Sequence, residues 1–125
     1  MDEYKRTPLH YICIDVSKER RLEKAAEEIK NGEDINAQDI NGWTPLHFAA
    51  QENDPKIAEY LISQGAKIDI VDVNGNTPLW VAAMNSYSGN QTVDVLVEFG
   101  SDPDQKNFHD VSPAEVCPEL FQNAI

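Results

Sequence analysis

Apolar residues recur along the chain in short stripes that have the spacing of an amphipathic helix. The pattern is clearest in residues 56–66, where apolar side chains stand at i, i+3, i+4 and i+5, at Ile57, Tyr60, Leu61 and Ile62. Residues 93–100 repeat this pattern. Residues 18–31 are mostly charged and keep a narrower apolar stripe, made of Leu22, Ala25, Ala26 and Ile29. The periodicity predicts three helices that each bury one face. For the first of them it predicts a solvated outer face without salt-bridge stabilisation.

Four copies of one tetrapeptide mark the start of a second set of helices. Three copies begin Thr-Pro-Leu, at Thr7, Thr44 and Thr77, and a weaker copy begins at Ser112; their starts lie 37, 33 and 35 residues apart. A threonine or serine hydroxyl can cap a helix, and proline suits the first helical position. Asn-Gly pairs at 41–42 and 74–75 predict tight turns just before two of the copies. The chain is thus predicted to repeat a unit of turn, helix and helix about every 33 residues.

These motifs resemble the ankyrin repeat. Residues 39–50 resemble the first half of that repeat and residues 56–66 resemble its second half. The resemblance implies an all-α fold, a solenoid of helix-turn-helix units whose β-turn fingers project to one side. It implies a single domain of four repeats, at about residues 2–38, 39–71, 72–106 and 107–125, the last being a truncated C-terminal cap.

Three of the repeats are irregular. Repeat one has four extra residues, and Lys5 stands where two later turns have glycine; its charged second helix suits a terminal cap. Repeat three has two extra residues in the loop 85–90, which we expect on the surface. Repeat four has Asp110 at the turn glycine and Pro118 inside its first helix. We therefore expect that helix to break and a short helix to follow at 119–123.

The charge of the chain is uneven along the sequence. The net charge is −12, yet residues 1–32 hold seven acids and seven bases, so the whole excess of negative charge belongs to the last three repeats. Such a field repels nucleic acid and anionic membranes and steers basic partners, although it also serves solubility alone. No apolar run approaches the length of a membrane span. Because the N-terminus reads directly into repeat one, we expect no signal peptide. Cys13 and Cys117 fall in the first and last repeats, so we expect no disulfide and a cytoplasmic, reduced protein.

No catalytic or metal-binding pattern is present in the sequence. The resemblance implies that His10 and His47 bond the backbone of an adjoining turn. The cysteines and histidines lack zinc spacing, and the sequence has no phosphate loop and no calcium loop. We predict that the protein has no cofactor and is not an enzyme. The remote alternative is a pocket for a small ligand or a reaction, for which the irregular residues are Tyr87, His109, Asp110 and Cys117.

Ankyrin-like stacks usually bind partners on the concave side, formed by the fingers and the first helices. By register, the candidate contact residues are Tyr4, Arg6, Ile40, Asn41, Trp43, Gln51, Glu52, Asp72, Val73, Asn76, Met84, Asn85, Tyr87, Phe108 and His109. Trp43 is the strongest single candidate, because aromatic anchors dominate binding energies. Alternatively, Trp43 packs within a finger, Asp72 supports its turn, and Ile40 and Val73 pack on neighbouring fingers.

The leading hypothesis for function is a protein–protein interaction module that masks or inhibits a basic partner protein. One specific form is an immunity (antitoxin-like) protein that covers a basic active site by charge mimicry. The alternative is an adaptor or scaffold whose partner need not be basic, and an enzyme or small-ligand binder is a remote third. We expect no nucleic-acid or membrane partner, and a monomer outside the complex.

Overall fold

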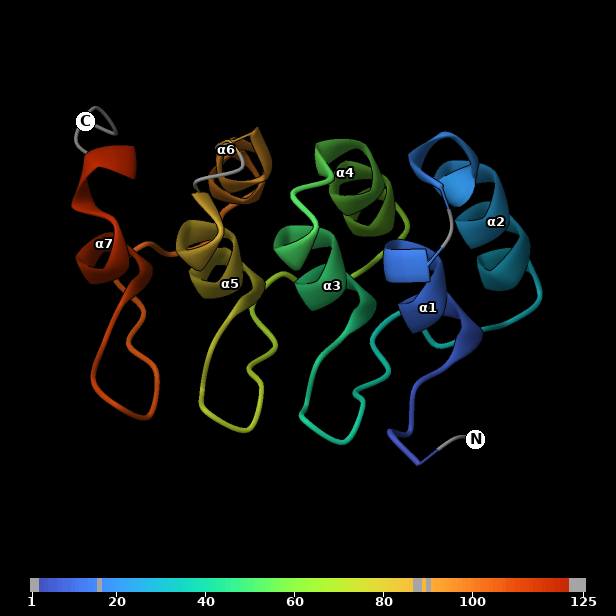
Figure 1. Cartoon of the computed structure of the whole chain (residues 1–125), viewed down its shortest axis with the longest axis horizontal. Helices are drawn as coiled ribbons and strands as arrows, with labels where there is room; N and C mark the ends of the chain where they lie inside the picture. The colour runs from blue at the N-terminus through green and yellow to red at the C-terminus, as the bar shows by residue number, and fades with distance from the viewer. Residues whose placement is uncertain (1–2, 16, 87–88, 90, 122–125) are drawn as a thin grey trace.

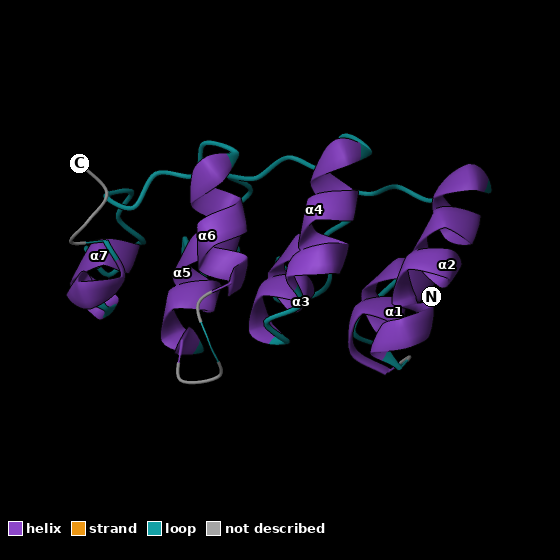
Figure 2. Ribbon diagram, turned by 90° about the horizontal axis from the view of Figure 1, so that it is seen from above, coloured by secondary structure: helices purple, strands orange, loops and turns teal. Residues whose placement is uncertain are grey.

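Pairs of short helices stack side by side along one axis (Figure 1). The computed structural model describes residues 3–15, 17–86, 89 and 91–121. The helices are α1 (Pro8–Asp15), α2 (Lys18–Lys30), α3 (Pro45–Gln51), α4 (Pro55–Ser63), α5 (Pro78–Met84), α6 (Gln91–Glu98), α7 (Pro113–Val116) and the 3₁₀ helix η2 (Pro118–Leu120). Helices α1, α3, α5 and α7 form one layer, and α2, α4 and α6 form the other (Figures 1 and 2). The described residues contain no strand, and a finger projects before each first-layer helix (Figure 1).

The repeated threonines and prolines start the first-layer helices as the sequence predicts. The Thr44 hydroxyl accepts a hydrogen bond from the His47 amide, and the Thr77 hydroxyl accepts one from the Trp80 amide. Ser112 caps α7 in the same way, and a proline follows each cap. These local bonds satisfy backbone donors that a helix leaves open at its N-terminus.

The apolar core runs along the whole stack. The leucine of each Thr-Pro-Leu copy is fully or almost fully buried, at Leu9, Leu46 and Leu79. Leu61 and Leu96 lie opposite them on the second-layer helices and are also buried. Small residues keep neighbouring first-layer helices close, and Cys13 is one of them, with no exposed surface. Each repeat therefore buries its core residues against its neighbours, as expected for a solenoid.

Two histidines join successive repeats. His10 Nε2 lies 2.7 Å from the carbonyl oxygen of Trp43, and His47 Nε2 lies 2.9 Å from that of Asn76. The Nδ1 atom of each ring accepts the backbone N–H of its capping threonine, at 2.9 and 3.1 Å, which leaves the proton on Nε2 as the donor. Burial lowers the pKa of both histidines. The expected backbone-bonding role is confirmed at both positions.

Helix α2 differs from the sequence-based prediction in which residues it buries. Arg21 is only 4% exposed, whereas Leu22, expected in the inward stripe, is 38% exposed. The Arg21 guanidinium contacts the Asp54 carboxylate at 3.0 Å and the Glu52 carboxylate at 3.4 Å. The expectation of a helix without ion-pair support was therefore wrong at this position. A buried ion pair ties α2 to the second repeat, and a lone buried charge there would be costly.

The turn residues that replace glycine in the first and fourth fingers adopt a backbone conformation that favours glycine. Asp110 has a φ of 66°, and Lys5 in the first finger has a φ of 58°, so both adopt the left-handed conformation of the glycines they replace. Helix α7 ends at Val116, and the expected short helix begins one residue early, at Pro118, as a 3₁₀ turn. The remainder of the predicted 119–123 helix lies partly outside the described residues.

Candidate protein-binding surface

Each of the last three fingers is held by one buried polar side chain. The Oδ1 atom of Asp39 accepts hydrogen bonds from two finger amides at 2.9 and 2.8 Å, those of Asn41 and Trp43. Asp72 does the same in the third repeat, and Asn107 replaces it in the fourth. The alternative role for Asp72, support of its turn, therefore matches the geometry.

Two of the candidate contact residues lie inside the stack. Asp72 is 5% exposed, and its Oδ2 atom accepts a hydrogen bond from the Trp43 ring nitrogen at 2.9 Å. Asn76 is 8% exposed, and its side-chain oxygen accepts a bond from the Asn107 amide at 2.7 Å. Both side chains are occupied in joining one finger to the next. We therefore remove them from the contact surface predicted by register.

Main-chain hydrogen bonds connect the fingers in series. The amide of Ile40 donates to the carbonyl of Tyr4 at 2.7 Å, that of Val73 to Asn41 at 3.0 Å, and that of Phe108 to Asn74 at 2.9 Å. The packing between fingers is tight, since a Cβ on Gly75 would lie 2.7 Å from the Phe108 amide nitrogen. Four turns distant in sequence thus form one connected edge.

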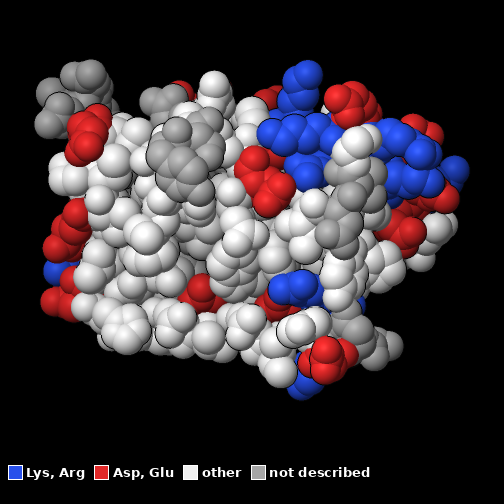
Figure 3. All heavy atoms as spheres, in the orientation of Figure 1, with Lys and Arg blue, Asp and Glu red and all other residues white. Residues whose placement is uncertain are grey.

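Large apolar side chains stand exposed along this edge. Ile40, Val73 and Phe108 occupy the same position in successive fingers and are 53%, 60% and 72% exposed. Tyr4, in the first finger, is 45% exposed. We call these four residues the finger row. On the face shown in Figure 3, the fingers that precede α3, α5 and α7 present mostly uncharged side chains along the lower edge. Neither Ile40 nor Val73 is buried by a neighbouring finger, so both apolar side chains are accessible to a partner.

Trp43 has the packing role considered for it and is also partly exposed. Its indole stacks on His47 with ring centroids 5.6 Å apart and meets Phe48 at 4.9 Å. The rest of the ring lines a pocket of about 280 Å³ together with Arg6, Asn41 and Gln51. Trp43 is therefore a structural residue that also presents surface to the space between the fingers and α3.

Arg6 is held in place by aromatic rings at the edge of the same pocket. Its guanidinium lies 4.8 Å from the ring centre of Tyr4, 5.0 Å from that of Phe48 and 5.6 Å from that of Tyr11. It also pairs with Asp39 at 3.4 Å. The sequence-based candidates omitted Phe48 and Tyr11, whose supporting role depends on contacts between repeats. The sequence held a signal for both, because Tyr11 and Phe48 follow the Thr-Pro-Leu-His of their repeats at the position where the third repeat has valine.

The remaining candidates divide by exposure. Gln51 and Met84 occupy the last residues of α3 and α5 and are exposed, as are Asn41 and His109 in the fingers. Glu52 is half-buried and pairs with Arg21, and Asn85 is half-buried and donates to the Val81 carbonyl at 2.9 Å. Tyr87 lies outside the described residues.

The described part of the chain offers a surface for contact, with no metal-binding geometry. Within residues 3–15, 17–86, 89 and 91–121, no three His, Cys, Asp or Glu side chains are placed to hold a metal ion. None of the described helices has the length and apolar character needed to cross a membrane. Of the irregular residues in repeats three and four, Cys117 has its sulfur 3.6 Å from the Ser86 hydroxyl.

Comparisons with known proteins agree with this architecture. The family description "Ankyrin repeats (3 copies)" matches residues 16–107. Over 35 residues, the chain is 54% identical to protein phosphatase 1 regulatory subunit 27 of Mus musculus and to that of Homo sapiens. The similarity covers 28% of this chain and 23% of each relative, a stretch about as long as one repeat. Because the family match covers most of the chain and the structure has the same repeated helix pairs, the protein belongs to the ankyrin-repeat family.

Proposed function

We propose that this protein binds another protein through the finger row and the pocket beside Trp43. The observation that carries the proposal is the exposure of Ile40, Val73 and Phe108 at equivalent positions on one hydrogen-bonded edge. Their exposed apolar surface serves no turn and no core. Burial of such surface by a partner stabilises a complex by about 25 cal/mol per Å² before the costs of association. The ankyrin family, and relatives named as regulatory subunits, also suggest a binding module without catalysis.

In its narrower form, the proposal is that the chain masks a basic surface of its partner, as an immunity protein does. Negative charge supports this form, because the excess lies in repeats two to four. Several exposed carboxylates of the protein lie on the segments that link one repeat to the next, at Asp34, Asp69, Asp102 and Asp104. These acids would steer a basic partner, while the finger row would supply the contact. The proposal includes a monomer outside the complex and a cytoplasmic location, and the free state of both cysteines fits a reducing compartment.

The alternative is an adaptor whose partner carries no excess of positive charge. Ionic strength separates the two forms. Steering by acids weakens as salt rises, because the screening length falls to about 3 Å at 1 M salt. Contact through apolar surface alone persists at high salt. A partner whose affinity is unchanged between low and high salt would therefore favour the adaptor.

The test uses quantitative affinity capture with wild-type protein and three surface variants. Val73→Asp and Phe108→Ser alter the finger row. Phe99→Ser is the control, because Phe99 is an exposed phenylalanine too, at 45%, but follows α6. We expect one stoichiometric partner that both finger variants lose and the control retains. Purified protein phosphatase 1 is included as a defined candidate. Equal capture by all variants would remove the finger row from the proposal.

A further inference from the structure

The last segment of the chain is tied together by its own bonds. The Lys106 ammonium contacts the Glu115 carboxylate at 3.8 Å, which joins the linking segment to α7. The Ala114 amide donates to the Pro103 carbonyl at 2.9 Å, across the fourth finger. We call residues 102–121 the terminal unit, because these bonds connect its linking segment, finger and helices.

Repeats one to three are joined to one another by several side-chain links. His10 and His47 each bond a carbonyl of the next finger. The buried Arg21 pairs with two carboxylates of repeat two. The Asn53 side-chain oxygen accepts the Thr92 hydroxyl at 2.8 Å, which connects repeat two to the start of α6. Removal of any one of these links leaves other polar links in the first three repeats.

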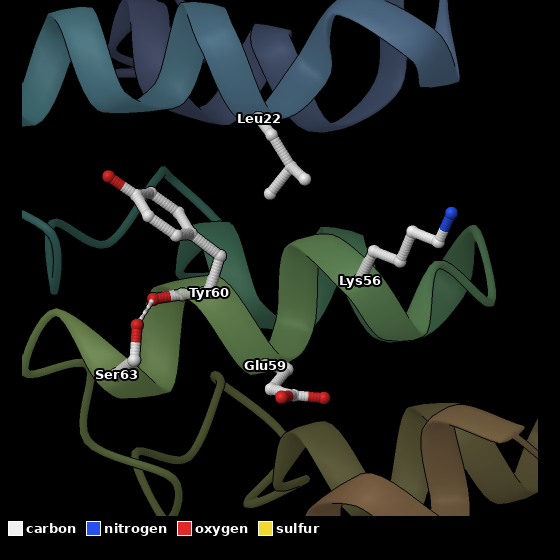
Figure 4. Close-up of a pocket in the computed structure, with 5 residues that line it drawn as sticks. All are labelled: Leu22, Lys56, Glu59, Tyr60 and Ser63. Atoms are coloured by element: carbon white, nitrogen blue, oxygen red, sulfur yellow. Dashed lines mark hydrogen bonds between the residues drawn. The ribbon is translucent and has the colours of Figure 1, made fainter.

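The second helical layer adds to this connection only in the first three repeats. Its helices α2, α4 and α6 have 13, 9 and 8 residues, and Leu22 and Tyr60 extend into the space between α2 and α4 (Figure 4). In the described chain α7 is followed only by the three-residue η2. Among the described residues, the last buried leucine, isoleucine, valine or aromatic side chain is Leu96. The terminal unit therefore contributes little to the apolar core.

A tryptophan replaces the bridging histidine where repeat three meets the terminal unit. Trp80 follows its Thr-Pro-Leu as His10 and His47 follow theirs. The ring N–H of Trp80 is buried and has no hydrogen-bond partner among the described residues. A buried donor without a partner weakens the structure around it. This interface therefore lacks the side-chain bridge of the two earlier interfaces.

The polar contacts that remain at this interface are few. Those between described residues of the terminal unit and of repeat three are Asn107 to Asn76 at 2.7 Å, Phe108 to Asn74 at 2.9 Å and Cys117 to Ser86 at 3.6 Å. No ion pair of the described residues crosses the interface, since both pairs of Lys106 stay inside the terminal unit. Helix α7 also packs on α5, so the unit is docked, but by fewer links than its neighbours.

We propose that the terminal unit undocks from repeat three as one cooperative unit while repeats one to three stay folded. Its internal bonds make its residues leave together, and the weaker interface makes them leave first. Phe108, the most exposed member of the finger row, leaves with the unit, so undocking shortens the row. The consequence for binding rests on the proposed function. A partner that contacts Val73 and Phe108 together would hold the unit docked.

Native-state amide hydrogen exchange of the wild-type protein measures undocking. The Phe108 amide donates across the interface, and the Val73 amide makes the equivalent bond between repeats two and three, so Val73 is the matched control. The Ala114 amide is bonded inside the terminal unit. We expect Phe108 and Ala114 to share one opening equilibrium and to be protected at least about tenfold less than Val73.

A disulfide that locks the interface should suppress undocking. Ser86→Cys places a thiol beside Cys117, and oxidised glutathione can join the two, while Cys13 has no exposed surface. Mass spectrometry confirms the bond, and the reduced form of the same variant is the control. Oxidation should raise the protection of Phe108 at least about tenfold and change that of Val73 by less than about twofold.

A second variant should favour undocking. Asn76→Ala removes the acceptor of the Asn107 side chain and should lower the protection of Phe108 at least about tenfold. Asn36→Ala is the matched control, because its side chain accepts the Lys67 amide at 2.9 Å, far from this interface. The control should leave Phe108 within about twofold of wild type. This variant decides the question if the disulfide does not form.

Equal protection of Phe108 and Val73 in the wild-type protein would overturn the proposal. So would a locked protein whose Phe108 amide exchanges as fast as in the reduced form, or equal effects of the two asparagine variants. Clearly different protection of Phe108 and Ala114 would reduce the event to fraying of one finger, which also overturns it. All of these measurements use the protein alone. Failure to capture a partner would therefore remove the finger-row proposal and leave undocking intact.

Discussion

The contact between neighbouring fingers can be tested by adding one methyl group to a turn. Gly75 has a φ of 79°, and a Cβ there would lie 2.6 Å from a ring carbon of Phe108 and 2.7 Å from its amide nitrogen. Gly32 has a φ of 89°, and a Cβ there would meet nothing within 4 Å. Gly75→Ala and Gly32→Ala therefore share backbone strain and differ in the clash with the next finger.

The expected losses follow from these two terms. An L-residue in a left-handed conformation costs roughly 1–2 kcal/mol, which is the whole expected effect of Gly32→Ala. In Gly75→Ala, Phe108 must move, and its amide donates to Asn74 at 2.9 Å. Loss of that hydrogen bond and overpacking add roughly 1–3 kcal/mol. The total, roughly 2–5 kcal/mol, is a large part of the stability of a small domain.

Urea unfolding followed by circular dichroism measures both free energies of unfolding. Amide hydrogen exchange at Phe108 and Asn74 reports whether the fourth finger has separated from the third. We expect Gly75→Ala to be the less stable variant and to lose protection at the fourth finger first. Equal free energies of unfolding in the two variants would refute the argument, because strain alone would then account for the loss at Gly75.

Three further predictions concern buried groups. Arg21→Met leaves a buried carboxylate unpaired and should lower the free energy of unfolding by roughly 3–5 kcal/mol, whereas Arg20→Met, at an exposed position, should change it by less than about 0.5 kcal/mol in the same urea assay. Burial lowers the pKa of His10 and His47, so below about pH 6.5 the unfolded state binds more protons than the folded state. The free energy of unfolding should therefore decrease as the pH is lowered, by at most about 1.4 kcal/mol per pH unit for each histidine. Urea unfolding at pH 7.5 and 5.5 checks this, and an equally steep fall in His47→Gln would contradict it. Burial raises the pKa of Cys13 to about 12, so its reaction with a thiol reagent should be slow and follow unfolding, while the other cysteine reacts faster; fast reaction of both in native buffer would contradict the buried position.

The features that the sequence predicted well depend on residues close together in the chain. Caps at Thr44 and Thr77, the turn at Asp110 and the break at Pro118 are each decided within a few residues. The repeated motif then placed these local units in one frame. The register also brought Ile40 and Val73 to equivalent positions, although it could not say that both are exposed.

The errors involve partners from neighbouring repeats. Periodicity alone does not fix the rotation of α2 against α4. It therefore predicted an exposed Arg21 and a buried Leu22, whereas the structure buries Arg21 and exposes Leu22. Asp72 and Asn76 looked available because their partners, Trp43 and Asn107, lie 29 and 31 residues away. Such contacts depend on how tightly successive fingers pack, which is set by the stack as a whole.

Beside the side-chain bonds that join neighbouring fingers, three hydrogen bonds between fingers use main-chain atoms alone. Ile40, Val73 and Phe108 each donate a backbone amide, and their side chains take no part in the bond. Almost any residue type except proline can therefore occupy these positions without loss of a hydrogen bond. If the finger row binds as proposed, substitution along this edge would change the partner while the scaffold stays constant. The same independence makes these three positions suitable for a combinatorial library aimed at new targets.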